Sequence, residues 1–541
     1  MQGGKRFIFS LVFISFIFAL FFFSGCSEQA PEAENGGADT DAAPKDELIL
    51  AVGYEPDEGW DPVAGWGRYG SPLFQSTLLK RDSNLRIEND LATSYEVSED
   101  ALTWTVTIRD DAVFSDGEKL TADDVVFTFQ KTKESGSVVD LNLLTEVKTL
   151  DDYTIEFTLE RPHSAFSAIL VSTGIVPEHA YDSNYAENPV GSGPFKLLQW
   201  DKGQQLIVEA NPLYYGEQPF FKRITFLFLE EDAAFAAARA GEVQIAAIPH
   251  AFGDQQVSGM SLVNLESIDN RGIMFPFVKA GGETEDGKPI GNDVTADLAI
   301  RQAINIAVDR QALVSGALNG FGTPAYTVCD HMPWWNPETV LNDADFETAA
   351  AILAEVGWED TDGDGILEKN GLKASFSLIY PASDMTRQAL ALGVAEMIRP
   401  LGIDIKAEGK SWDDIQELMH SNAVLFGWGS YDPIEMFNLY HSSMAGFSWY
   451  NTGFYNNAAV DEYMELALSA TSEEEANSYW KKAQWDGETG FSGKADAPWV
   501  WLVNLGHLYL VDENLDIGKQ KVQPHGHGWP FTDNIAEWKW R

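Results

Sequence analysis

The sequence predicts an α/β protein with more than one hydrophobic core. Residues 103–108 alternate large apolar side chains with threonines, which is the period of a half-buried strand. A polar Ser-Asp-Gly turn follows at 115–117, and Thr121 and Asp124 then have the spacing of a capping box at the start of a helix. The chain has 541 residues, 45% of them hydrophobic and 12% aromatic, so we expect roughly two or three domains.

Other stretches alternate between strand and helix patterns in the same way. Residues 48–52 predict a first strand, and 53–70 form a Gly/Pro-rich segment of a length that is usually functional or disordered. A Gly-Ser-Gly-Pro turn at 191–194 leads into a predicted strand at 195–200. Residues 300–318 carry an amphipathic helical face. The order of these patterns supports the α/β class.

The N-terminus predicts export. Lys5 and Arg6 precede an apolar run at 7–23, and Cys26 follows two small residues. This pattern indicates a lipoprotein signal peptide over residues 1–25, with Cys26 as the lipidated residue. An uncleaved membrane anchor is the alternative, since the run is near the lower length limit for a span. Either interpretation places the body outside the cytoplasm, held at the membrane.

Residues 26–46 predict a flexible tether between the anchor and the body. From residue 27 onward they contain no large aliphatic or aromatic side chain, so they cannot bury enough apolar surface to offset the entropy of ordering. The other cysteine of the chain, Cys329, is expected to be a small buried residue. With Cys26 committed to lipid, we expect no disulfide in the mature chain.

The formal net charge of -47 argues against nucleic acid or anionic lipid as a partner, because the field would repel both. An acidic surface suits an extracytoplasmic protein in a saline or alkaline habitat, and a calcium-loaded protein is the alternative. Residues 360–365 (DTDGDG) begin like an EF-hand loop, but Gly371 stands where the bidentate carboxylate belongs. We therefore interpret this segment as an acidic turn.

Signatures of catalysis are missing from the sequence. Residues 282–288 have the spacing of a phosphate-binding loop, but Pro289 replaces the required Ser or Thr. There is no H-E-x-x-H pair, no paired C-x-x-C and no G-x-S-x-G elbow. We expect no enzyme activity, and a hydrolase with a dispersed site is a remote alternative.

Six blocks of the sequence together resemble one known family. They lie at 92–131, 188–200, 211–219, 238–245, 300–322 and 428–433. In this order they are similar to the blocks of the family 5 extracytoplasmic solute-binding proteins, the peptide- and nickel-binding subunits of ABC importers. The resemblance covers most of the mature chain.

The resemblance implies a two-lobed clamp like that of periplasmic binding proteins, class II, of the large dipeptide/nickel-binding type. Lobe I would comprise residues 47–78, 190–280 and 505–541, with a subdomain inserted at 79–189, and lobe II would comprise 281–504. The implied partners are a small-molecule or short-peptide ligand in the cleft, an ABC permease and its ATPase. The protein is expected to be a monomer, held at the membrane by its N-terminal lipid, without a cofactor of its own.

The segment 425–441 (LFGWGSYDPIEMFNLYH) is the strongest candidate for the pocket. Trp428 stands between two glycines, and Tyr431-Asp432-Pro433 turns the chain sharply. The resemblance to nickel-type members implies that Trp428 and Tyr431 line the pocket. Peptide-type members carry an aspartate near this position that pairs with the ligand's amino terminus. Asp432 fits that role, and an Asx-type turn is the equal alternative.

Histidines are the candidate metal ligands. His441 follows the aromatic loop and resembles in placement the histidine of nickel-type members. His507 lies in a strand-like stretch, and the pair His525 and His527 can share one face of an extended segment. Each has a hydrogen-bonded structural role as its alternative.

The long first loop supplies the last candidates, Trp66 and Arg68. Nickel-type members often hold the carboxylates of a chelator with arginines of the inserted subdomain, but residues 134–149 contain none. Arg68 is the nearest substitute, because a guanidinium grips a carboxylate bidentately. A solvated loop arginine is its alternative role. The sequence thus predicts a binder of nickel as a small organic chelate, with a short peptide as the competing ligand.

Overall fold

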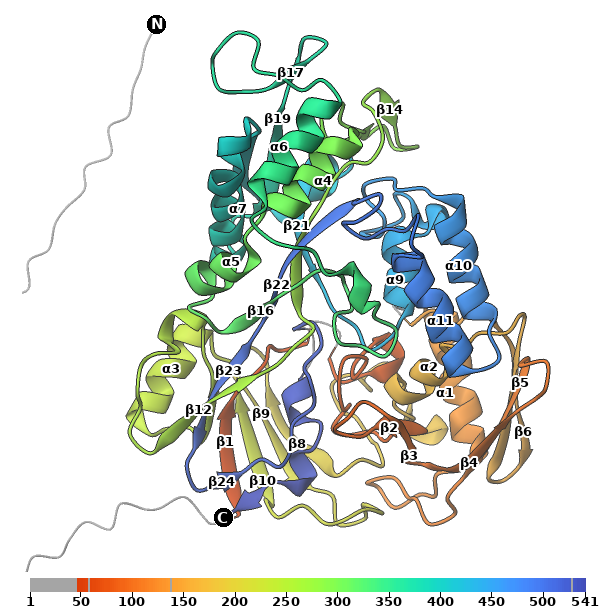
Figure 1. Cartoon of the computed structure of the whole chain (residues 1–541). Helices are drawn as coiled ribbons and strands as arrows, with labels where there is room; N and C mark the ends of the chain where they lie inside the picture. The colour runs from red at the N-terminus through yellow and green to blue at the C-terminus, as the bar shows by residue number, and fades with distance from the viewer. Residues whose placement is uncertain (1–45, 57–58, 137–138, 527–528) are drawn as a thin grey trace, which may run out of the picture. The chain divides into compact units, whose positions relative to one another are not determined.

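The computed structural model describes residues 46–56, 59–136, 139–526 and 529–541. Two large β-sheets and one smaller sheet carry most of the strands (Figure 1). The predicted signal peptide, Cys26 and most of the predicted tether lie outside the described residues. Within the part that is described, no helix combines the length and hydropathy needed to cross a membrane.

The seven-stranded sheet draws its strands from three separate parts of the chain. Its order is β12-β23-β11-β1-β10-β9-β8, and β1 is parallel to both of its neighbours while the other pairs are antiparallel. The bounds are β1 Glu47–Ala51, β8 Phe195–Asp201, β9 Gln205–Ala210, β10 Arg223–Leu227, β11 Ile245–Ala247, β12 Met260–Leu265 and β23 His507–Asp512. The structure confirms the predicted strands at 48–52 and 195–200. Helix α3 (Glu231–Ala240) packs against β11.

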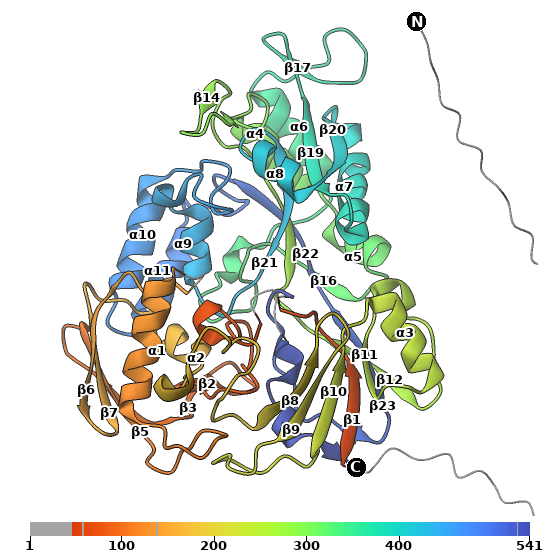
Figure 2. The ribbon, with the colours of Figure 1, turned by 180° about the vertical axis from the view of Figure 1, so that it is seen from behind.

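A four-stranded antiparallel sheet follows β1 in the chain, in the order β4-β5-β7-β6. Its bounds are β4 Ala92–Val97, β5 Thr103–Ile108, β6 Leu144–Asp151 and β7 Thr154–Leu159. The large apolar residues of β5 are buried and its threonines half-buried, which confirms the predicted strand. Helix α1 (Ala122–Ser135) packs on β6 and β7 (Figure 2). The carboxylate of Asp124 accepts the backbone N–H of Thr121 at 2.9 Å, which confirms the predicted helix start.

The six-stranded sheet has helices on both faces. Its order is β16-β22-β13-β21-β19-β20, and β19 is parallel to both β20 and β21. The bounds are β13 Asn270–Met274, β16 Gly322–Pro324, β19 Ser375–Pro381, β20 Asp404–Lys410, β21 Ala423–Trp428 and β22 Trp499–Leu505. Neighbouring residues of β21, such as Leu425 and Phe426, belong to two different hydrophobic cores. One core holds α4 Leu298–Ala307, α5 Arg310–Ala317, α6 Phe346–Glu355 and α7 Met385–Ile398, and the other holds α8 Trp412–Leu418, α9 Ile434–Tyr440, α10 Ala458–Ser469 and α11 Glu473–Gln484.

The helix predicted over 300–318 is in fact two helices, α4 and α5. Val308 has extended backbone angles, with φ -64° and ψ 129°, and so ends α4. Asp309 then caps α5, because its carboxylate accepts the backbone N–H of Ala312 at 2.8 Å. An aspartate favours a helix cap over a helix interior, and the apolar period alone hid this break.

Two points connect the large sheets. The first is the link from β12 to β13, and the second is Gly506, which separates β22 from β23. The sequence assigned residues 190–280 to lobe I. This range includes β13, which pairs with β21 and β22 in the six-stranded sheet. The crossing therefore begins near Asp269.

The remaining elements are short. They are α2 Phe166–Ser172, the paired strands β2 Leu79–Arg81 and β3 Ile87–Asn89, β14 Gly282–Glu283 and β15 Pro289–Ile290, β17 Glu368–Lys369 and β18 Leu372–Lys373, and β24 Leu515–Asp516 and β25 Lys539–Trp540. Single 3-10 turns lie at Pro62–Ala64, Glu178–Ala180, His250–Phe252, Pro337–Thr339, Arg399–Leu401, Ser442–Met444, Pro530–Thr532 and Ile535–Glu537.

Candidate functional site

The loop between β21 and α9 presents Trp428 beside a tight backbone crossing. Gly429 has φ 142°, and a Cβ atom there would overlap the carbonyl oxygen of Ile268, so only glycine fits. The indole ring of Trp428 is half-buried, 5.8 Å from the ring of Tyr450, and its Nε1 atom has no hydrogen-bond partner in the described part of the chain. Trp428 therefore offers an unused donor in an aromatic setting.

Glu435, in the first turn of α9, is the most unusual group near Trp428. Its carboxylate accepts the backbone N–H groups of Gly429 and Ser430, each at 3.1 Å. Burial raises the pKa of Glu435 to about 8 in spite of these bonds, and the negative charge of Asp432 adds to the shift. Among the described residues, no lysine, arginine or histidine forms an ion pair with it. This carboxyl group lacks a cation.

Asp432 and Tyr431 are both engaged in the local fold. The carboxylate of Asp432 accepts the backbone N–H of Ile434 at 2.9 Å, which is the Asx-type turn that the sequence left open. Burial raises the pKa of Asp432 to about 6. The hydroxyl of Tyr431 donates to the carbonyl oxygen of Val522, and its own carbonyl accepts from Arg81 at 3.0 Å.

The first loop brings Arg68 to the same region. Its guanidinium lies over the ring of Tyr69, 4.8 Å from the ring centre. Burial raises the pKa of Tyr69, the charge of Arg68 opposes this shift, and the charge of Glu435 adds to it. The same two charges act on Tyr450. Arg68, Tyr69 and Tyr431 also line a cavity of about 380 Å³. The structure therefore places Trp428, Arg68 and Glu435 around two tyrosines.

Trp66 lies elsewhere, in contrast to its predicted place in the ligand site. Only 3% of it is exposed, and its ring meets those of Trp60 at 4.7 Å and Trp529 at 5.5 Å. Its Nε1–H donates to the carbonyl oxygen of Pro72 at 2.7 Å. Trp66 is thus a core residue, because apolar packing and a satisfied indole nitrogen hold it there.

Two of the four predicted histidines meet at one buried carboxylate, Asp269. The Nε2 atom of His507 lies 3.1 Å from Oδ2 of Asp269, and the Nδ1 atom of His525 lies 2.6 Å from Oδ1. The backbone N–H of His525 also donates to the carbonyl of Gly429 at 2.7 Å. Burial alone would raise the pKa of Asp269, but the charges of Arg271 and His525 and the histidine hydrogen bonds hold it well below its usual value.

His441 does not join this pair. Its ring stacks on Phe437 with 4.1 Å between ring centres, and its Nδ1 atom lies 2.7 Å from the hydroxyl oxygen of Ser443. Its Nε2 atom faces Asp461 at 3.9 Å and Glu465 at 3.6 Å. His441 therefore does not meet His507 at Asp269, because it packs between α9 and α10. His527 lies outside the described residues.

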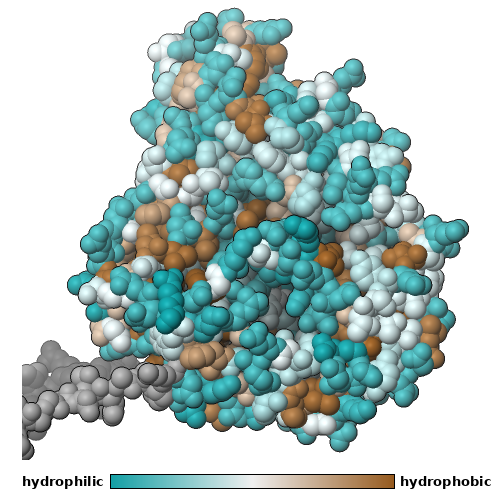
Figure 3. All heavy atoms as spheres, turned by 60° about the horizontal axis from the view of Figure 1, so that its bottom comes forward, coloured by the Kyte–Doolittle hydropathy of each residue, from teal (hydrophilic) through white to brown (hydrophobic). Residues whose placement is uncertain are grey.

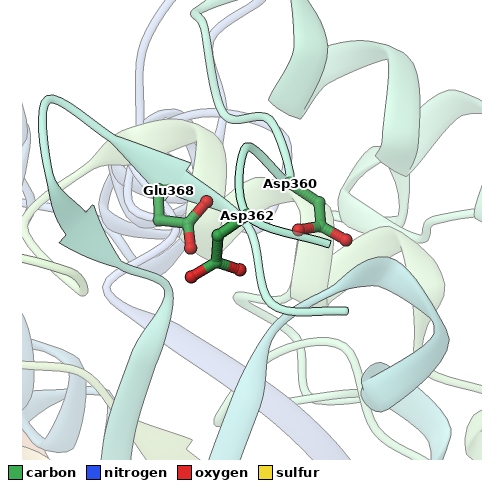
Figure 4. A group of neighbouring side chains, drawn as sticks. All are labelled: Asp360, Asp362 and Glu368. Carbon is green, nitrogen blue, oxygen red and sulfur yellow. The ribbon is translucent and has the colours of Figure 1, made fainter. Parts of the chain in front are cut away.

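A set of three carboxylates with metal-ligand spacing lies in the acidic turn. Asp360, Asp362 and Glu368 place their oxygens close together (Figure 4), the one such group in the part of the chain that is described. The Nζ atom of Lys373 already lies 3.1 Å from Asp362 and 3.5 Å from Glu368, and it also pairs with Asp364. A cation of the chain thus already pairs with three carboxylates of the turn, which agrees with its interpretation as a structural feature.

The face in Figure 3 is mostly hydrophilic, with small separate hydrophobic patches.

Sequence patterns missed Asp269, Arg271, Glu435 and Tyr450. The segment at Asp269 and Arg271 has no spacing that marks a site, and Asp269 acquires its two histidine partners from remote parts of the chain. Glu435 carries a weak signal, since it lies two residues after Asp-Pro at a helix start.

The family model described as "Bacterial extracellular solute-binding proteins, family 5 Middle" matches residues 86–451. The chain belongs to this family. Protein XP55 of Streptomyces lividans is 33% identical over 510 residues, which cover 91% of this chain and 89% of that protein. The oligopeptide-binding protein AppA of Bacillus subtilis is 29% identical over 475 residues, which cover 82% of this chain and 83% of AppA.

Two solved structures are also similar. NikZ from Campylobacter jejuni in complex with Ni(L-His) is 26% identical, with a TM-score of 0.77 and coverage of 92% of this chain and 100% of that one. AppA from Bacillus subtilis in complex with a nonapeptide is 26% identical, with a TM-score of 0.69 and coverage of 92% and 99%. The family 5 protein is thus a peptide/nickel-type substrate-binding protein of an ABC importer with the two-lobed fold. The remote alternative of a hydrolase is wrong, since the relatives of this chain are solute-binding proteins.

Proposed function

We propose that this family 5 protein captures a short peptide through the peptide's protonated amino terminus and delivers it to an ABC permease. The observation that carries the proposal is Glu435, a half-buried carboxyl group with a raised pKa and two backbone donors but no cation. An ammonium group of a ligand would supply the missing charge and strengthen both existing hydrogen bonds electrostatically.

The surroundings of Glu435 support a peptide as well. The rings of Trp428, Tyr450 and Tyr69 offer flat apolar contact, and the free Nε1–H of Trp428 can donate to a peptide carbonyl. In this proposal Glu435 takes the role that the sequence offered to Asp432. Asp432 instead fixes the loop through its bond to the backbone of Ile434.

Nickel held by a small organic chelator, the ligand preferred from the sequence, is the second candidate. It is favoured by the similarity to NikZ, whose structure contains Ni(L-His). An amino-acid chelator would also bring nitrogen and carboxylate groups to the site. Against it stands the engagement of His507 and His525 by Asp269, which leaves no open set of imidazoles among the described residues.

Mass spectrometry and metal analysis of ligand retained on the purified protein provide the first test. Calorimetric titration with trialanine, N-acetyl-trialanine, nickel alone and nickel with L-histidine provides the second. We expect trialanine to bind and its acetylated form to bind about tenfold more weakly or not at all, since acetylation removes the charge that Glu435 would pair with. In Glu435→Gln this discrimination should disappear.

Glu396→Gln is a matched control, because that carboxylate is 80% exposed on α7. It should leave the peptide discrimination unchanged. Binding of nickel with L-histidine but of neither peptide would overturn the peptide proposal in favour of the chelate. Equal binding of the free and acetylated peptides would show that Glu435 does not hold the amino terminus.

Anchoring through Cys26 is a further part of the proposed function. The sequence predicts that Cys26 carries the lipid that holds the protein at the outer face of the membrane. Cys26→Ser should leave the protein unprocessed or release it from the membrane fraction. If fractionation finds this variant processed and bound as firmly as the parent, the lipoprotein assignment fails.

A further inference from the structure

The hairpin of β2 and β3 contacts the part of the molecule that holds α8 to α11. In both Figure 1 and Figure 2 the hairpin lies below α9 to α11. Nη1 of Arg81, at the end of β2, donates to the carbonyl of Leu85 at 3.0 Å, and Nη2 donates to the carbonyl of Tyr431 at 3.0 Å. Tyr431 lies 350 residues further along the chain, in the loop that leads to Glu435. Arg81 thus connects the hairpin with the loop of the candidate ligand site.

Leu85, at the tip of the hairpin, has a strained backbone. Its φ angle is 66°, in the left-handed region that a bulky side chain rarely adopts. Its side chain packs against the hydrophobic core of α8 to α11. Strain of this kind persists only where the surrounding contacts enforce it. The contact with the helices therefore holds the tip of the hairpin in place.

The charges around Arg81 favour the same contact. Burial lowers the pKa of Arg81, and the negative charges of Asp432 and Glu473 oppose this shift. Asp432 follows Tyr431, and Glu473 is the first residue of α11. Electrostatic attraction thus acts between the hairpin and the helices, in addition to the hydrogen bond.

A second contact lies at the C-terminal end of α10. The backbone N–H of Ser164 donates to the carbonyl of Leu468 at 2.9 Å, and the hydroxyl of Ser164 donates to the carbonyl of Ala467 at 2.9 Å. The last carbonyls of a helix have no partner of the usual kind within that helix, so Ser164 caps α10 from another part of the chain. His163 and Ala165 are 8% and 4% exposed, so the turn is buried on both sides of the capping serine.

Both contacts join the same two parts of the molecule. The hairpin and Ser164 come before the link from β12 to β13, whereas Tyr431 and α10 lie between that link and Gly506. These are the two points at which the large sheets are connected. A rotation about them would separate the two parts and break both contacts together.

We propose that Arg81, Leu85 and Ser164 form a latch that holds the two lobes closed. Arg81 and Ser164 are positioning residues, because they act on the loop of the ligand site and on α10 without touching the ligand. The latch shifts the equilibrium between the open and closed forms, whichever ligand binds. Its failure should therefore increase the population of the open form and the rate of ligand release.

Hydrogen exchange of the ligand-free protein, followed by mass spectrometry, tests the latch. The amide of Ser164 exchanges when α10 moves away. We expect Arg81→Gln to accelerate this exchange about tenfold, because the two contacts open together. Amides of α2 and β5 should exchange as in the parent, which checks that the variant is folded. Arg81→Lys should give an intermediate rate, because it keeps the charge and loses the fork.

Arg86→Gln is the matched control for this measurement. Arg86 lies in the same hairpin, but its side chain is 77% exposed, so the variant should leave the exchange of Ser164 unchanged. An unchanged rate in Arg81→Gln, or an equal change in both variants, would overturn the latch. So would a rate at Ser164 of the parent as slow as that of β5, since the contact would then open only on global unfolding.

Ser164→Ala tests the second contact, because it removes the hydroxyl bond to Ala467 and keeps the backbone. In the ligand-free variant we expect a larger radius of gyration by small-angle X-ray scattering. Ser315→Ala is the matched control, since the Ser315 hydroxyl donates to a carbonyl of its own helix, that of Gln311, at 2.9 Å. Its radius should equal that of the parent. A parental radius in both Ser164→Ala and Arg81→Gln would overturn the latch.

The release of trialanine, followed by stopped-flow tryptophan fluorescence, measures the effect on binding. We expect Ser164→Ala to release it about threefold to tenfold faster than the parent, and Ser315→Ala to release it at the parental rate. Equal rates in the parent and Ser164→Ala would overturn the latch. If trialanine does not bind the parent, the peptide proposal fails, and the two ligand-free measurements still decide whether the latch exists.

Discussion

Carboxylates gather both in the acidic turn at 360–368 and in the loop segment at 432–435, but the two regions differ in how their negative charge is compensated. In the turn, Lys373 pairs with three carboxylates, and the pKa values of Asp364 and Glu368 are lowered, chiefly by hydrogen bonds from Lys373 and from the backbone of Thr361. In the loop, Glu435 and Asp432 have backbone donors but no ion pair with any residue that the structure describes, and burial raises their pKa values. The carboxylates of the turn thus share a lysine of the chain, whereas those of the loop have no cation paired with them among the described residues.

This difference shows why a dense acidic motif is a poor guide to a site. The DTDGDG sequence has the more conspicuous pattern, but Lys373 of the same chain already pairs with two of its aspartates. Glu435 is a single residue in an apolar helix start, and its environment makes it the more reactive group. Asp269 is the third case, a buried carboxylate that has cations.

The largest effect is expected for Asp269→Asn. This carboxylate, 5% exposed, pairs with Arg271, His507 and His525, so its neutralisation leaves a buried arginine uncompensated. We expect a loss of about 3 to 5 kcal/mol in the free energy of unfolding, measured by urea denaturation at pH 7. Because the folded pKa of Asp269 lies below its unfolded value, the parent should lose this contribution as the pH falls through the folded pKa. A variant as stable as the parent would show that the Asp269 carboxylate does not stabilise the crossing between the two large sheets.

Glu435→Gln should have the opposite sign. The folded pKa of about 8 exceeds the ordinary value of 4.5, so the ionised carboxylate costs stability in the free protein. The parent should lose up to about 1.4 kcal/mol per pH unit between these values as the pH rises, and the variant should lose less. Denaturation curves from pH 5 to about pH 8.5 measure the slope. Parallel slopes for parent and variant would show that Glu435 is already compensated.

The affinity for trialanine should depend on pH through the same group. In the proposed peptide site, binding requires an ionised Glu435 and a protonated amino terminus, whose ordinary pKa is about 8. We therefore expect an optimum near pH 8 and a fall of about tenfold from pH 7 to pH 6, measured by calorimetry. A fall centred on pH 6.5 that depends on His507 would favour a histidine-bound metal instead.

The smallest effect is expected for Lys373→Ala in the acidic turn. Removal of this ammonium group leaves Asp362, Asp364 and Glu368 without the cation that pairs with them, and Asp362 and Glu368 belong to the three-carboxylate group with Asp360. About 1 mM calcium should then raise the melting temperature of the variant more than that of the parent, since weak calcium sites work in this range. An equal response of the two proteins would mean that Lys373 does not occupy the position of a metal ion.

The sequence by itself determined the class of fold and the family. The strand at 103–108, the helix start at Thr121 and the first strand all follow from patterns within a few residues, and the structure confirms them. It also placed Trp428 and Arg68 among the candidates, although their role in binding stays a prediction. The single helix over 300–318 failed because Asp309 favours a cap over a continuous helix.

The tertiary structure decided which charges meet. Asp269 lies 238 residues from His507 and 256 from His525 in sequence. It also buried Trp66 and separated His441 from the other histidines. Local periodicity follows from the backbone geometry of a helix or strand, and so the sequence displays it. Electrostatic partners depend on distances between remote segments, which are fixed only when the sheets pack.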